Sequence, residues 1–188
     1  MKKIDLKSVL IGLLVGTNLM FLLGAKQQED LIVTKAIKLI NDDGKQIAFL
    51  GTGDDGDGLL VTFNSDGKET AFLGTGDDGD GLLVTSNSDG KETAYLGTGK
   101  GGGGGLRTSN SDGKETAYLG TGESGDGGFL RTHNADGKQT AYLGGGHLTV
   151  YNKTGEMVGY FGSNKDNDGI ARLYDRYGDI GWGMSGKK

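Results

Sequence analysis

The sequence contains no cysteine and no proline, and only two of its 188 residues are histidines. Without cysteine the chain has neither disulfides nor a lipid attachment site of the lipoprotein type, so its fold must hold without cross-links. The lack of proline and of a Gly-X-Y period excludes a collagen helix. His133 and His147 belong to no Ser-His-Asp or Cys-His set, and we predict no enzymatic activity.

Apolar and aromatic residues are also scarce, at 34% and 7% of the chain, whereas 39 residues are glycine. This composition predicts a thin core that depends strongly on backbone hydrogen bonds. Beyond residue 25 the chain carries 17 basic and 24 acidic side chains, a net charge of −7. Because such a charge repels phosphate backbones, we expect no nucleic-acid partner.

The N-terminal segment differs from the rest of the chain. Lys2, Lys3 and Lys7 precede an apolar run over residues 9–25, and the acidic pair at 29–30 follows it. This charge order predicts a membrane segment with its N-terminus in the cytoplasm and the remaining residues outside. The run is short for a span, and residues 23–25 are compatible with a signal-peptide cleavage site. An uncleaved signal-anchor and a cleaved signal peptide therefore both stay open, followed by a linker over residues 26–35.

A phrase of thirteen residues, NSDGKETAYLGTG, stands at 87–99 and again at 110–122. Its turn signal recurs at intervals of 23, 23, 23, 24, 18 and 23 residues, starting at Asn41, Asn64, Asn87, Asn110, Asn134, Asn152 and Asp175. A repeat of this length indicates a solenoid or another array. We place the array at 36–174 and interpret residues 175–188, where Trp182 breaks the pattern, as an atypical capping repeat.

Each repeat shows constant apolar columns that alternate with variable ones. After the turn come an alanine, an aromatic residue and a leucine, as in Ala94, Tyr95 and Leu96; before it stand Leu83, Val84 and Thr85 and their equivalents. This period of two predicts two short strands in each repeat. The fold class is therefore all-β, a β-solenoid or a trimeric β-helix-like rod of about 23-residue rungs.

The Asn-Ser-Asp-Gly turn admits two connections. Locally it is a good hairpin signal. A simple three-residue hairpin would, however, place Val84 opposite Ala94 and bring Arg107 and Arg131 onto the face of the alanines and leucines. A β-arch, in which the strands pair with neighbouring repeats, keeps both apolar column pairs inside. We favour the arch, with either a slim single-chain solenoid or a homotrimer completing the core.

Two sets of side chains are candidate binding residues. The first two acidic loops offer oxygen ligands of the kind that Ca²⁺ takes: Asp54, Asp55, Asp57, Asp77, Asp78 and Asp80. The equivalent loop at 100–105 is a lysine followed by five glycines, so weak Ca²⁺ binding competes with the interpretation as solvated loops. No other cofactor is expected.

The aromatic column is the second set and consists of Phe49, Phe72, Tyr95, Tyr118, Tyr142 and Tyr160. Exposed rings in a row could stack on the apolar faces of sugars and bind a glycan. Stacked rings could equally stabilise the ladder between neighbouring rungs.

The unit [N/D]-x-D-G-K-x-x-A-[YF]-L-G resembles that of a group of bacterial exported proteins, which carry arrays of this phrase behind one N-terminal hydrophobic segment. A weaker resemblance, to YD/RHS repeats, rests on LYDRYGDIGWG (173–183) and VYNKTGEMVGYFG (150–162). Neither resemblance supplies catalytic residues. We expect a non-catalytic extracytoplasmic stalk or spacer, anchored in the membrane or secreted, with a glycan- or ligand-binding surface module as the alternative.

Overall fold

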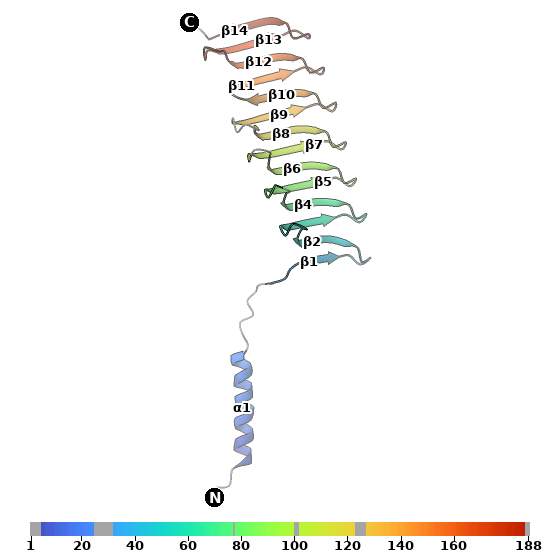
Figure 1. Ribbon diagram of the computed structural model, residues 1–188, viewed down its shortest axis with the longest axis vertical. Coiled ribbons are helices and arrows are strands. Elements are labelled where there is room, and N and C mark those ends of the chain that lie inside the picture. Colours follow the sequence, from blue (N-terminus) through green and yellow to red (C-terminus); the bar gives the residue numbers. More distant parts are fainter. Residues whose placement is uncertain (1–4, 25–31, 77, 100–101, 123–126, 187–188) are drawn as a thin grey trace. The chain divides into compact units, whose positions relative to one another are not determined.

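The computed structural model describes residues 5–24, 32–76, 78–99, 102–122 and 127–186. The chain divides into two compact units, residues 1–34 and 35–188. The first contains helix α1 (Leu6–Gly24), and the second contains a sheet (Figure 1). No helix in the described part of the chain combines the length and the apolar character needed to cross a membrane.

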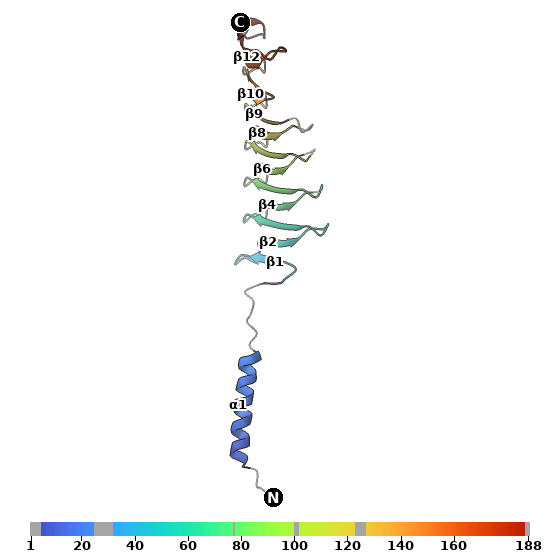
Figure 2. The ribbon, with the colours of Figure 1, turned by 90° about the vertical axis from the view of Figure 1, so that its left-hand side faces the viewer.

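The second unit is one antiparallel sheet of fourteen strands in chain order (Figures 1 and 2). The strands are β1 (Ile37–Ile40), β2 (Gln46–Thr52), β3 (Gly58–Phe63), β4 (Glu69–Thr75), β5 (Gly81–Ser86), β6 (Glu92–Thr98), β7 (Gly104–Ser109), β8 (Glu115–Thr121), β9 (Gly128–His133), β10 (Gln139–Gly144), β11 (His147–Tyr151), β12 (Met157–Ser163), β13 (Gly169–Tyr174) and β14 (Ile180–Ser185). The expectation of a repetitive all-β chain with two strands in each repeat is confirmed.

The Asn-x-Asp-Gly turns are hairpins with three-residue loops. In the turn at residues 87–91, the N–H of Gly90 donates to the carbonyl of Asn87 (2.9 Å) and the N–H of Asn87 to that of Lys91 (2.8 Å). Gly90 has φ +79°, the left-handed conformation that closes this type of loop. The Asn87 side-chain oxygen accepts the N–H groups of Asp89 and Lys91, both at 3.0 Å, which satisfies the turn amides.

Most turns at the other ends of the strands follow the same plan with glycine in place of asparagine, and the turn between β12 and β13 starts at Asn164. Gly76 N–H donates to the Asp80 carbonyl (2.8 Å) and Gly79 N–H to the Gly76 carbonyl (2.9 Å). The short connection between β10 and β11 is instead a two-residue turn through Gly145 (φ +56°) and Gly146 (φ +78°). The repeat interval of 18 residues is thus produced by a tighter turn, with the pairing of the strands retained.

The prediction of β-arches is wrong, and the reason is a β-bulge. In the seven hairpins β1–β2, β3–β4, β5–β6, β7–β8, β9–β10, β11–β12 and β13–β14, each closed by an Asn or Asp turn, the register shifts by one residue. The β12–β13 hairpin, which is closed by a turn at Asn164, keeps its register. Between β5 and β6, both Thr93 and Ala94 lie opposite Thr85, so Val84 faces Tyr95 and not Ala94. The bulge therefore aligns the apolar columns on one face without an arch, and no solenoid coil forms in the described sheet.

The sheet has two unlike faces. We name the first the leucine face, which has two long rows. Its central row is Ile37, Leu50, Leu60, Leu73, Leu83, Leu96, Leu106, Leu119, Leu130, Leu143, Leu148, Phe161, Ala171 and Met184. Beside it run Leu39, Ala48, Thr62, Ala71, Thr85, Ala94, Thr108, Ala117, Thr132, Ala141, Val150, Gly159, Leu173 and Trp182.

The opposite side, the aromatic face, also has two long rows. The first is Lys38, Phe49, Val61, Phe72, Val84, Tyr95, Arg107, Tyr118, Arg131, Tyr142, Thr149, Tyr160, Arg172 and Gly183. The second contains seven of the strand glycines, including Gly74, Gly97 and Gly120.

Burial reverses the expectation about which columns form the core. The leucines of the central row, from Leu50 to Leu148, are 38–54% exposed. Among the described residues the buried hydrophobic side chains are Val61 and Ile170, both on the aromatic face. The thin core is therefore on the aromatic face, and the leucine and alanine columns do not fill an interior within one chain.

The final repeat extends the sheet regularly. β14 pairs with β13, and Trp182 lies opposite Leu173 in the row occupied elsewhere by alanine and threonine. All six residues of β14 are exposed. The interpretation of residues 175–188 as a cap stays a prediction.

The strand glycines of the aromatic face provide the space in which the aromatic rings lie. A Cβ atom built on Gly97 would be 2.9 Å from the Tyr95 hydroxyl oxygen and 2.8 Å from the Leu82 Cβ. A Cβ atom built on Gly74 or on Gly120 would lie at a similar distance from the ring of Phe72 or of Tyr118, respectively. Each ring thus covers the bare backbone of the glycine two residues further along its own strand.

We predict that Gly97→Ala lowers the free energy of unfolding by about 1–3 kcal/mol, because the added methyl group displaces the Tyr95 ring. Gly81→Ala, on the adjacent strand β5, is the matched control, since a Cβ there has no neighbour within 4 Å. Urea unfolding followed by circular dichroism measures both variants. Equal stability of the two would contradict this account of the glycine row.

Candidate functional site

The aromatic face brings together all six residues of the predicted aromatic column. They lie in one row at alternate strands, from Phe49 on β2 to Tyr160 on β12. The residue between two neighbours in this row is Val61, Val84, Arg107, Arg131 or Thr149. The prediction that the aromatic residues line up across the repeats is confirmed.

Several ring faces in the row are in contact with neighbouring side chains. Tyr118, Phe129, Tyr142, His147 and Tyr160 form a continuous stack over five consecutive strands, with successive ring centroids 5.2, 5.6, 5.3 and 5.4 Å apart. Phe129 and His147 belong to the glycine row and fill the places between the tyrosines. This geometry is that of a ladder that stabilises neighbouring strands.

Two of the tyrosine hydroxyls also have partners within the sheet. The Tyr95 hydroxyl donates to the Thr98 carbonyl (2.8 Å), and that of Tyr160 to the Ser163 carbonyl (3.0 Å). These bonds hold the rings down along their own strands, over the glycines. The rings therefore do not stand up from the sheet as platforms for a sugar.

Arginines extend the ladder where the intervening residue is charged. The Arg107 guanidinium carbon lies 5.2 Å from the centroid of the Tyr95 ring, and that of Arg131 lies 5.0 Å from the Tyr118 ring. Such cation–π contacts add modestly to the packing of neighbouring strands. Arg107 also pairs with Glu92.

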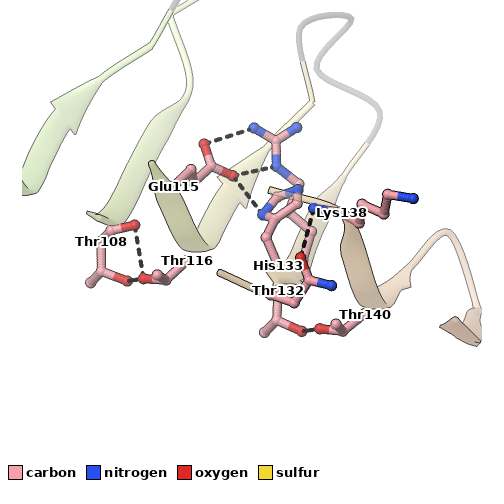
Figure 3. A network of polar contacts seen from close by, with 9 residues as sticks. Thr108, Glu115, Thr116, Thr132, His133, Lys138 and Thr140 are labelled. Atoms are coloured by element: carbon pink, nitrogen blue, oxygen red, sulfur yellow. Dashed lines mark hydrogen bonds and ion pairs between the residues drawn. The ribbon is translucent and has the colours of Figure 1, made fainter. Parts of the chain in front are cut away.

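Glu115 is the centre of the most connected ionic cluster (Figure 3). The Arg131 Nε and Nη2 atoms donate to the two Glu115 carboxylate oxygens at 2.8 and 3.1 Å, a bidentate pair. His133 Nδ1 is 3.4 Å from the same carboxylate, without the geometry of a hydrogen bond. The Arg131 hydrogen bonds, together with the charges of Arg131, His133 and Arg107, lower the pKa of Glu115, although partial burial opposes the shift.

The cluster is a structural tie between strands. Glu115 is on β8, and its partners Arg131 and His133 are both on β9. The bond to Glu115 raises the pKa of Arg131, so the pair stays ionised at neutral pH. His147, the other histidine, lies within the aromatic stack.

If one unpaired residue per hairpin is included in the strand register, the sequence alone places the residues of this cluster on one face. Glu69, Glu92 and Glu115 form one column of the repeat, and Arg107 and Arg131 belong to another. The arch interpretation separated the two columns, whereas the bulged hairpin places them on the same face. The residues that the analysis of the sequence missed are Glu92, Glu115, Arg131 and Phe129.

The acidic loops form tight turns. Gly53 N–H donates to the Asp57 carbonyl at 2.8 Å, which closes a five-residue turn around the exposed Asp54 and Asp55. In the described part of the chain, no three His, Cys, Asp or Glu side chains gather into a group that could hold a metal ion. Asp77 lies outside the described residues, and Asp78 and Asp80 are exposed on the equivalent turn. Ca²⁺ binding stays a prediction of the sequence.

No protein-family model matches the chain, and no curated protein matches it.

We predict that Glu115→Gln lowers the free energy of unfolding at pH 7 by at most about 1 kcal/mol, since Arg131 is more than a third exposed. The folded-state pKa of Glu115 is below its ordinary value of 4.5, so its contribution is present above that pH and is lost as the pH falls further. The difference between wild type and variant in urea unfolding should therefore shrink as the pH falls below 4.5.

Glu69→Gln is the matched control for this experiment. Glu69 occupies the same column as Glu115, but the position equivalent to Arg131 is Val84. The control variant should show a smaller loss at pH 7. A stability loss at pH 7 that is no larger for Glu115→Gln than for Glu69→Gln would contradict the assignment of the ion pair.

Proposed function

We propose that the chain is a non-catalytic structural repeat protein that acts as an extracytoplasmic stalk or spacer. The observation that carries the proposal is that the constant asparagine, glycine and bulge-threonine columns of the repeat each have a structural role in the sheet. Asn87 caps its turn, Gly97 accommodates the Tyr95 ring, and Thr93 pairs with Thr85 across the bulge. Residues fully engaged in this way are building elements of an array and not copies of a binding site.

The dimensions of the sheet suit a spacer. Thirteen steps between fourteen strands, at about 4.8 Å each, give a length of roughly 60 Å along the stacking direction. Each strand contacts only its neighbours in the sequence, so repeats can be added without changing the fold. The extracytoplasmic location and the membrane anchor are inferred from the charge order around residues 9–25. The same segment admits both an uncleaved signal-anchor and a cleaved signal peptide.

The alternative function, glycan binding by the aromatic face, has weaker support. Sugars stack on exposed ring faces, whereas the rings from Tyr118 to Tyr160 face one another. Tyr95 and Tyr118 are in addition covered by the guanidinium groups of Arg107 and Arg131. We therefore assign the column to the stability of the sheet. The solenoid alternative would require arch connections between the strands.

A triple variant, Tyr95→Ser, Tyr118→Ser and Tyr142→Ser, distinguishes the two functions. If the rings are structural, the triple variant should unfold at a much lower urea concentration than wild type. Each substitution should cost less than the ~3–5 kcal/mol of a fully buried aromatic residue, because these rings are only half-buried.

The matched control replaces the same three tyrosines by phenylalanine, which keeps the rings and should leave the protein folded. Circular dichroism measures folding, and binding to a panel of immobilised polysaccharides measures recognition. A serine variant with wild-type stability that loses polysaccharide binding would overturn the structural assignment in favour of glycan recognition.

A further inference from the structure

The leucine face is an apolar surface without a covering layer in the described chain. Its central row carries leucines that are 38–54% exposed, and Phe161 and Met184 are 67% and 60% exposed. Around Leu119, Leu130, Leu143 and Leu148 the surface is slightly hollowed. Exposed apolar patches larger than a few hundred Å² mark interaction sites in soluble proteins.

No charged side chain interrupts this face. On the fourteen strands, all of which are described, every Asp, Glu, Lys and Arg of the paired positions belongs to the aromatic face, as Lys38, Glu92 and Arg107 do. The leucine-face rows contain only apolar residues, threonine and glycine. A surface that met only water would have no reason to exclude charge over so many strands.

The threonine hydroxyls in the row of the leucine face where alanine and threonine alternate are already satisfied. The Thr62–Thr70, Thr85–Thr93, Thr108–Thr116 and Thr132–Thr140 pairs join their Oγ1 atoms at 2.9, 3.2, 2.9 and 2.8 Å. Thr93 and Thr116 Oγ1 also donate to the carbonyls of Thr85 and Thr108, both at 3.1 Å. Figure 3 shows two of these pairs on the side of the strands opposite Glu115. Burying the face would therefore leave no hydroxyl of these pairs without a partner.

The relief of the face is complementary to itself. The leucine row forms a ridge, and on one side of it lies the row in which alanine and threonine alternate. On the other side, small residues pair as Thr75 with Gly81 and Thr98 with Gly104. The ridge of one sheet can lie in the shallow groove beside the ridge of an identical sheet, at the usual separation of about 10 Å between packed sheets.

The size of the face matches a stable interface. A strip roughly 60 Å long and about 15 Å wide, the span of three side-chain positions on a strand, offers roughly 900 Å² per chain. Two chains would bury about 1,800 Å² in total, within the range of specific protein–protein interfaces. Because the apolar rows extend from β1 to β14, an occupant that covers them must have the same length, as a second copy has.

The charge at the edges of the sheet disfavours a lipid surface. The turns beside the leucine face carry exposed Asp54, Asp55 and Asp57 at one edge, and Asp66 and Asp89 at the other. Exposed lysines such as Lys68 balance the second edge only in part. Anionic lipid headgroups attract basic clusters and not acidic ones.

We infer that the leucine face is the interface of a homodimer, in which two copies pack face to face as a two-layer β-sandwich. A two-fold axis between the layers makes the contact self-complementary and closed, as is usual for homodimers. The aromatic faces then point outward on both sides. This inference does not depend on the proposed spacer function, because a dimer could serve any role of the array.

The first test measures the mass of the full-length protein by multi-angle light scattering over a range of concentrations. Wild type should have twice the monomer mass of 19.6 kDa. The double variant Leu96→Glu and Leu119→Glu should be monomeric or have a dissociation constant at least about 100-fold higher, since it places unpaired carboxylates in an apolar layer. Both leucines are more than half exposed within one chain, so the longer side chains have room in the monomer.

The matched control, Ser88→Glu and Ser111→Glu, adds the same charge on two exposed turns and should remain dimeric. Monomeric wild type, a trimeric mass, or a dimer that survives the leucine substitutions would each overturn the inference. Loss of the dimer by the control as well would also overturn it, because general repulsion would then explain the result.

Cross-linking tests the same interface without disturbing its charge. The chain has no cysteine, so a single introduced thiol is unambiguous. Leu106 on β7 is near the middle of the sheet and lies close to its counterpart whichever way the two-fold axis runs. Leu106→Cys should be captured as a dimer by a short bismaleimide, whereas Arg107→Cys, on the opposite face, should not. Equal capture of both variants, or of neither, would overturn the inference.

Discussion

The one-residue bulge in every second hairpin, from β1–β2 to β13–β14, is the constraint on which the arrangement of this sheet depends. A strand alternates its side chains between two faces, so one unpaired residue exchanges the faces of everything that follows. At Thr93 the exchange brings Leu96 opposite Leu83 and Tyr95 opposite Val84. Without the bulge, leucine rows and arginine rows would mix on both sides. The Thr85–Thr93 hydroxyl contact and the Thr93 bond to the Thr85 carbonyl hold the extra residue in place.

A single layer with two unlike faces follows from this register. The aromatic face covers itself, because each ring lies over a glycine and neighbouring rings or guanidinium groups fill the intervals. The leucine face has no such cover within the described chain, and its central leucines stay 38–54% exposed. Among the described residues of one chain, the array thus buries side chains on the aromatic face only. The leucine face stays exposed, and it is the face that we infer to form the dimer interface.

The sequence predicted the strands, the turns and the aromatic row, because each depends on local chemistry or on the period of two. Asn87 and Gly90 define the turn, and the alternation around Leu96 defines the strand. The connection was predicted wrongly because a bulge has no strong signal of its own: Thr93 is an ordinary strand residue. From that one misplaced register followed the missed pairing of Glu115 with Arg131 and the expectation of buried leucines.

The two faces also differ in how much the repeats vary, and the difference has a physical cause. On the aromatic face, the residue between two rings varies: Val84 stands where later repeats carry Arg107 and Arg131, and the glutamate column supplies these arginines with Glu92 and Glu115 as partners. These partners belong to the same chain, so individual repeats of this face can diverge independently. A two-fold contact instead brings the leucine rows of two identical chains against each other. One altered leucine would therefore appear twice in the interface, which favours a uniform row from Leu50 to Leu148.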